Sequence, residues 1–182
     1  MTAPAAPRRT RRVRPGLVLI GIGVVLLVAM WIYIYAFADT SNPNKLPDQA
    51  WTKKAEAICA GFGTQIKALP DATTFAKIKP KSEAIRQRAV VGQQVTDLLT
   101  QMVAALRASP SSDPVTRAAV DRWLGDYDTY LGDRHRQLDA WAAGQDPQFA
   151  ETAVGGKPIS LGMDDFADAN GMDACQVPQD LG

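Results

Sequence analysis

Residues 17–38 form an unbroken run of 22 uncharged and mostly apolar residues, LVLIGIGVVLLVAMWIYIYAFA. As an α-helix this run would be about 33 Å long, which matches the roughly 30 Å hydrocarbon core of a bilayer. Within lipid a lone segment must satisfy its backbone hydrogen bonds internally, so a helix is the expected form. The run therefore predicts a transmembrane helix over residues 17–38.

The residues on either side of this run predict its direction. Residues 1–16 carry five arginines and no acid, whereas the chain from Asp39 onward has a net charge of −4. Positive residues favour the cytoplasmic side of a membrane, and aromatic rings such as Trp31, Tyr33 and Tyr35 favour its interface. We therefore expect a basic cytoplasmic segment at 1–16 and a single-pass cell-membrane protein whose C-terminal domain lies outside the cytoplasm.

Cleavage is an alternative for the same segment. Ala36-Phe37-Ala38 resembles a small-x-small signal-peptidase site, and cutting after Ala38 would release the domain. The apolar run exceeds the roughly 7–15 residues of a signal-peptide core, so its length favours an uncleaved signal anchor. Because membrane orientation accounts for the arginines, we predict the lipid bilayer as a partner and no nucleic acid.

The rest of the chain predicts a polar linker at 39–47 and a helical domain at 48–182. Apolar residues recur at helical spacing in three stretches of this domain, and no stretch alternates as a strand would. Capping residues and prolines delimit helices at about 48–69, 81–108 and 114–143. The predicted fold class is all-α: an N-terminal transmembrane helix plus an extracytoplasmic three- to four-helix up-down bundle closed by a disulfide.

The pattern beyond Gly144 is less regular. We expect a short helix at 146–152, a flexible connection at 155–158, and a last short helix at 163–170. Asn170-Gly171 is typical of a helix stop, after which Met172 is expected to fold back as an apolar contact. The tail at 176–182 is predicted to be loose.

The disulfide is expected between the only two cysteines, Cys59 and Cys175. Extracytoplasmic compartments are oxidising, and two cysteines in such a domain favour pairing over free thiols. A redox-active pair is the alternative, but the C-x-x-C spacing is missing. The bond would fasten the C-terminal segment to the first helix of the domain.

The chain resembles a group of uncharacterised actinobacterial membrane-anchored or secreted helical proteins with one disulfide. The matching residues are Trp51, Ala55, Ile58 and Cys59 in an early helix, and Phe166-Ala167, Asn170-Gly171 and Cys175 in a late segment. The resemblance covers roughly residues 48–178. It implies a fold and a compartment but no activity.

The sequence shows no recognisable catalytic or metal site, so we predict a non-enzyme with no cofactor, catalytic residue or metal ligand. The single histidine, His135, lies between two arginines with no nucleophile motif elsewhere in the chain. A calcium loop that includes Asp168 and Asn170 is an alternative. It would place Phe166 and Val177 at ligand positions, which favours a solvated helix end instead.

Two arginines, Arg88 and Arg134, fall on the apolar faces of the second and third helices of the domain. A buried guanidinium is costly unless it is paired. We consider three answers: the head group reaches water over its apolar stem, it pairs with an acid of the C-terminal segment, or it lines a pocket for an anionic ligand. The acids considered are Asp164, Asp165 and Asp168.

The third helix also carries a stripe of tryptophan and tyrosine residues. Such a stripe is more typical of a hydrophobic core than of a ligand platform. Two roles remain open for the domain: a non-enzymatic envelope interaction or accessory module that contacts a membrane or envelope protein, or a helical domain that binds a small or lipidic ligand. An apolar cavity between the helices would favour the second.

Overall fold

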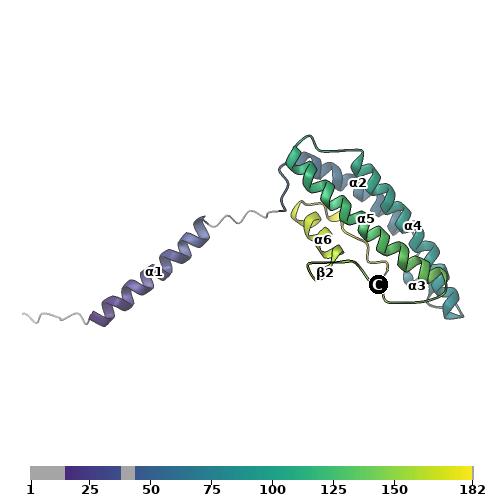
Figure 1. The fold of residues 1–182 in the computed structure, drawn as a ribbon, viewed down its shortest axis with the longest axis horizontal. Coiled ribbons are helices and arrows are strands. Elements are labelled where there is room, and N and C mark those ends of the chain that lie inside the picture. Colours follow the sequence, from purple (N-terminus) through teal and green to yellow (C-terminus); the bar gives the residue numbers. More distant parts are fainter. Residues whose placement is uncertain (1–14, 38–43, 182) are drawn as a thin grey trace, which may run out of the picture. The chain divides into compact units, whose positions relative to one another are not determined.

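The computed structural model describes residues 15–37 and 44–181 (Figure 1). The predicted basic segment up to residue 14, the proposed cleavage point after Ala38, most of the linker and the last residue lie outside these ranges. The chain divides into two compact units, residues 1–41 and 42–182, and each is described by itself.

The first unit contains one helix, α1 (Pro15–Phe37), which coincides with most of the apolar run. Its described large apolar side chains, such as Val25 and Ile32, are exposed. The rings of Trp31 and Tyr35, one turn apart, stack with their centroids 5.8 Å from each other. Within the described ranges, no helix meets the length and hydropathy required of a membrane span. The transmembrane helix therefore stays a prediction.

The second unit is built on three long helices, α2 (Gln49–Lys67), α4 (Lys81–Arg107) and α5 (Pro114–Ala142). Asp48 caps α2 by accepting a hydrogen bond from the backbone N–H of Trp51 at 2.9 Å. Asp113 caps α5 in the same way, through the N–H of Thr116 at 2.7 Å. Both caps satisfy backbone donors that a helix start leaves free, so the predicted starts are confirmed.

These three helices lie side by side, with α4 packed against both α2 and α5 (Figure 1). Their apolar faces enclose one main core, to which Trp51, Leu99 and Tyr127 contribute. Gly92 allows a close approach between α4 and α5, because a Cβ at this position would lie 2.4 Å from Cδ2 of Leu138. The described part of the chain is mostly helical and bundle-like, as the sequence predicts.

A fourth helix, α6 (Ile159–Ala169), packs against α5 and precedes a short 3-10 turn, η1 (Asp173–Cys175). The predicted stop after α6 is confirmed: Gly171 adopts a left-handed φ of 62°, which glycine tolerates best. The N–H of Met172 donates back to the carbonyl of Ala167 at 2.9 Å, and the Met172 side chain is fully buried. This turn directs the chain towards α2.

The predicted disulfide is confirmed. Cys59 on α2 is bonded to Cys175 in η1, with the two Cα atoms 5.1 Å apart. Beside the bond, the hydroxyl of Tyr127 donates to the carbonyl of Cys175. Burial raises the pKa of Tyr127, with nearby Asp164 adding to the shift, so this hydroxyl keeps its proton as a donor. The C-terminal segment is thus held against both α2 and α5.

The helix predicted at 146–152 is wrong, because tertiary hydrogen bonds take the backbone groups that it would need. Gln137 donates to the carbonyl of Pro147 at 2.8 Å, and the buried carboxylate of Asp133 accepts from the N–H of Thr152. The segment has no regular secondary structure and leads into a two-stranded hairpin, β1 (Ala153–Val154) and β2 (Lys157–Pro158).

The predicted flexible connection at 155–158 is the turn and second strand of this hairpin. Gly155 and Gly156 have φ angles of 60° and 79°. Two successive positive φ angles are typical of a type I′ turn, which fits the twist of paired strands. The loop after α2 also contains a short helix that the sequence analysis missed, α3 (Ala72–Phe75), which is capped by Asp71.

Removing the disulfide should destabilise the domain. The bond closes a loop across 116 positions, worth about 5 kcal/mol in the chain-entropy description. We expect the double variant Cys59→Ala/Cys175→Ala to lower the free energy of unfolding by an amount approaching this value, measured by urea denaturation of the full chain. Ala57→Ser, at an exposed position on the same helix, is the control. Equal urea midpoints for the double variant and the wild type would contradict this account.

Candidate ligand-binding groove

Arg134 is the largest fully buried side chain in the described part of the chain. Its two terminal nitrogens donate to the two carboxylate oxygens of Asp180 at 2.6 and 2.7 Å, and its Nε donates to the hydroxyl of Thr96 at 2.9 Å. Burial disfavours the charged guanidinium, but these bonds and the Asp180 charge outweigh it, so the pKa of Arg134 lies above its ordinary value. Three environments were predicted for this arginine: contact with water, an ion pair with an acid of the C-terminal segment, or a ligand pocket. The structure shows the ion pair.

The partner of Arg134 is nevertheless not one of the acids considered from the sequence. Asp164 accepts a hydrogen bond from the N–H of Val177 at 2.9 Å, and Asp165 and Asp168 are exposed. Asp180 belongs to the tail that the sequence analysis expects to be loose. That expectation is wrong for residues 176–181, which pack onto the domain.

Apolar contacts on both sides of Asp180 explain why this tail is held. Val177 and Leu181 are buried, and Leu181 packs in a small second core with Leu138 and Trp141. The sequence does carry one signal for this contact: the acid Asp180 lies between two apolar residues, Val177 and Leu181. The pattern is too short to indicate its partner, since the path of the tail depends on the disulfide.

Arg88 has a different environment from Arg134. Its guanidinium lies over the ring of Trp141, with Cζ 4.2 Å from the ring centroid. The residue is half-buried, and no carboxylate within the described ranges lies at ion-pair distance from it. Arg88 therefore combines an apolar stacking contact with an unpaired charge.

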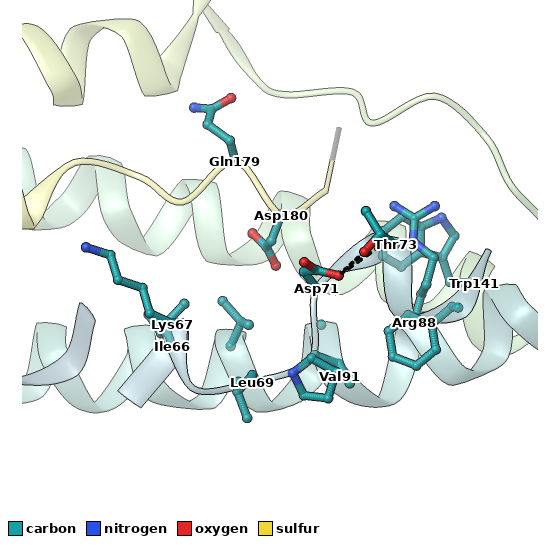
Figure 2. A pocket seen from close by; sticks show the side chains of 14 residues that line it. Ile66, Lys67, Leu69, Asp71, Thr73, Arg88, Val91, Trp141, Gln179 and Asp180 are labelled. Carbon is teal, nitrogen blue, oxygen red and sulfur yellow. Dashed lines mark hydrogen bonds between the residues drawn. The ribbon is translucent and has the colours of Figure 1, made fainter. Parts of the chain in front are cut away.

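Two adjoining cavities meet at Arg88 and Trp141, with volumes of about 350 and 630 Å³. Figure 2 shows the first cavity, into which residues from the end of α2, the α3 region, α4, α5 and the tail converge. We call this cavity the Arg88 groove. Its wall is largely apolar, and the contributing residues include Ile66, Leu69, Phe75, Val91 and Val95.

The acids of the Arg88 groove have hydrogen-bond partners within the domain, whereas its two cations have no ion pair within the described ranges. The carboxylate of Asp71 accepts hydrogen bonds from the hydroxyls and N–H groups of Thr73 and Thr74, and these lower its pKa. The carboxylate of Asp180 is held by Arg134. The two cations of the wall, Lys67 and Arg88, form no ion pair with any described residue.

Trp141, which contributes to this wall, carries an unsatisfied donor. The indole is almost fully buried, and its Nε1–H is the one buried side-chain donor in the described ranges that has no hydrogen-bond partner. Leaving a buried donor unpaired typically costs about 1–3 kcal/mol. Sequence reasoning did not single out this atom, because nothing in a sequence shows which tryptophan lacks a partner.

The remaining aromatic stripe of α5 is core, as predicted. Trp123, Tyr127 and Tyr130 are buried, and the indole N–H of Trp123 donates to the carbonyl of Met163 at 3.2 Å. Burial is the main cause that raises the pKa of Tyr130 to about 12. These rings are therefore packed inside the bundle and do not form an open platform.

The other sequence candidates do not come together in a site. His135 is exposed on α5. No group of three or more histidine, cysteine or acidic residues is arranged to hold a metal ion in the part of the chain that the structure describes. Comparison with known proteins gives no match, whether to a family model, a curated protein or a solved structure.

The ion pair between Arg134 and Asp180 should be asymmetric under mutation. Asp180→Ala leaves a fully buried guanidinium without its counter-charge, whereas Arg134→Met leaves a carboxylate that is 24% exposed and can reach water. Breaking a buried pair typically costs about 3–5 kcal/mol. We expect Asp180→Ala to lower the free energy of unfolding by about this much, Arg134→Met by less, and the double variant by less than the sum.

Urea denaturation of the full-length variants measures these differences, and Arg107→Met supplies the matched control. Arg107 pairs with Asp128 on the surface, where both side chains are about half-exposed. Loss of such an exposed pair should change the free energy of unfolding by less than about 1 kcal/mol. If Arg134→Met unfolds at the wild-type midpoint, the buried pair does not stabilise the fold.

Proposed function

We propose that this chain is a single-pass cell-membrane protein with a cytoplasmic N-terminus and an extracytoplasmic helical domain. The tether is the uncharged run 17–38, most of which is helical in α1. The five arginines before the run and the aromatic residues near its end support the orientation. The resemblance to anchored or secreted actinobacterial helical proteins supports the same placement.

The observation that carries this placement is the disulfide between Cys59 and Cys175. Stable disulfides are rare in the reducing cytosol and common in extracytoplasmic proteins. Here the bond is buried in the main core, where it fastens the end of the domain to α2. A domain built around this bond is suited to an oxidising compartment.

For the domain itself we propose a non-enzymatic role as an interaction or accessory module of the cell envelope. A short tether keeps the domain near the membrane, where it would meet another membrane or envelope protein. The hydrogen-bonded tail and the disulfide support a rigid body that presents a fixed surface. Rigid surfaces lose little conformational entropy when a partner binds.

A second candidate function is the binding of a small or lipidic ligand, and the Arg88 groove specifically favours it. A largely apolar cavity of about 350 Å³ with a few polar groups lies within the size range of small-molecule sites. The two roles are compatible, since a ligand could be presented to an envelope partner.

The topology can be tested with single cysteines introduced into the Cys59→Ala/Cys175→Ala chain. We expect Ser112→Cys, at an exposed turn, to react with an impermeant maleimide in intact cells. Thr2→Cys should react only after the membrane is opened, because the arginine-rich segment stays in the cytoplasm. The opposite labelling would contradict the orientation, and a mature chain that lacks residue 2 would contradict the uncleaved anchor.

The interaction role can be tested by photo-crosslinking in native membranes. A photoreactive amino acid is placed in turn at three exposed apolar positions on different parts of the domain: Val90, Val115 and Val154. A specific partner contacts one face, so we expect a discrete adduct from some of these positions and none from the others. Adducts only with abundant bystander proteins, at every position alike, would contradict the role.

A further inference from the structure

We propose that the Arg88 groove binds an amphipathic monocarboxylate, whose carboxylate is held by Arg88 and the Trp141 indole N–H and whose apolar body lies along the groove. This inference rests on the second candidate function and names its ligand class. The ligand would be an acyl or similar apolar chain with one carboxylate at its end.

The donors of Arg88 and Trp141 indicate that one end of the ligand is negatively charged. Arg88 is a guanidinium with no acidic partner, and Trp141 has a buried N–H with no acceptor. A carboxylate oxygen is the acceptor that satisfies both kinds of donor, and it bonds most strongly to a guanidinium. Of the two acids of the groove, Asp180 is paired with Arg134, and Asp71 accepts hydrogen bonds from Thr73 and Thr74 through one carboxylate oxygen. Among the described residues, the two cations without an ion pair, Lys67 and Arg88, outnumber the one acid without an ion pair, so the groove favours an anion.

The geometry of Trp141 places its two contacts on different parts of the ring. Arg88 covers the face of the indole. The six-membered ring approaches α4, with Cζ3 3.7 Å from the Cβ position of Gly92, so Nε1 at the opposite edge points away from α4. Trp141 and Arg88 line both cavities, and we place the carboxylate beside them. Because Nε1 itself is buried, the indole must turn slightly for the carboxylate to reach it.

The apolar body follows from the rest of the wall. Ile66 and Leu69 at the end of α2 are only half-buried, and they line the groove together with Val91 of α4 (Figure 2). Covering such side chains with an acyl chain removes apolar surface from water, at about 25 cal/mol for each Å². Lys67, also unpaired at the rim, adds a positive field that favours an anion over a neutral molecule.

The unpaired Trp141 N–H provides a direct spectroscopic test. The full chain is labelled with ¹⁵N-tryptophan in nonionic detergent micelles, the four indole signals are assigned by substitution, and octanoate is added. A new bond to a carboxylate should shift the Trp141 indole proton downfield in a saturable manner. Trp31, which lies in α1, reports any change in the micelle itself.

Variants and analogues identify the groups responsible. Octanol has the same chain without the charge and acetate has the charge without the chain, so neither should produce the shift at equal concentration. Arg88→Met should weaken octanoate binding about 10- to 100-fold, the usual range for loss of a hydrogen bond to a charged group. Arg86→Met, at an exposed arginine half a turn away on α4, should bind octanoate as the wild type does.

The outcomes separate this inference from the function on which it rests. A shift that octanol reproduces, or that persists unchanged in Arg88→Met, contradicts the carboxylate assignment but keeps a ligand in the groove. A Trp141 signal that no probe moves at millimolar concentration contradicts both. Affinity that rises from hexanoate to decanoate supports burial of the apolar body along the groove, and a constant affinity contradicts it.

Discussion

The bond between Cys59 and Cys175 is the constraint on which the C-terminal part of the domain depends. It holds η1 against α2, and the chain after it then runs to α5, where Asp180 pairs with Arg134. That path brings Val177 and Leu181 onto apolar surface and Asp180 to within hydrogen-bond distance of Arg134. The tail also supplies one wall of the Arg88 groove. A single covalent link therefore sets the position of a core, a buried charge pair and a cavity.

The buried pair shows why an arginine can lie inside this bundle at all. An isolated guanidinium in the core would cost several kcal/mol, and a hydrophobic residue of similar volume would often pack as well or better. The pair is tolerated because every nitrogen of the guanidinium has a hydrogen-bond acceptor. The carboxylate of Asp180 accepts from both terminal nitrogens, and the hydroxyl of Thr96 accepts from Nε. Asp180 remains partly exposed, so only one member of the pair loses most of its hydration. The pair thus fixes the position of the tail at a limited desolvation cost.

The sequence was sufficient where local chemistry decides the structure. Asp48 and Asp113 cap helices because their carboxylates reach donors only three residues away, and Gly171 stops a helix through its own backbone angle. It was insufficient where distant groups compete. Residues 146–152 carry signals of a helix start, yet Asp133 and Gln137 of α5 take their backbone groups. The partner of Arg134 was missed for the same reason, since it lies 46 residues away.

The two arginines on apolar helix faces differ in their partners: Arg134 has an ion pair inside the fold, and Arg88 has none within the described ranges. This difference is the main reason to expect a ligand in the Arg88 groove. Stacking on Trp141 and contact with water could account for Arg88 alone, since a guanidinium over an aromatic face is a stable arrangement. They do not account for the Trp141 N–H, which is buried, has no partner, and belongs to the same ring. Elsewhere the fold supplies partners for such groups: the indole of Trp123 reaches the carbonyl of Met163, and that of Trp51 reaches the carbonyl of Ser109. The ring of Trp141 lies against an unpaired cation and lines two cavities. Its buried donor without a partner is therefore better explained by an acceptor that comes from outside the chain.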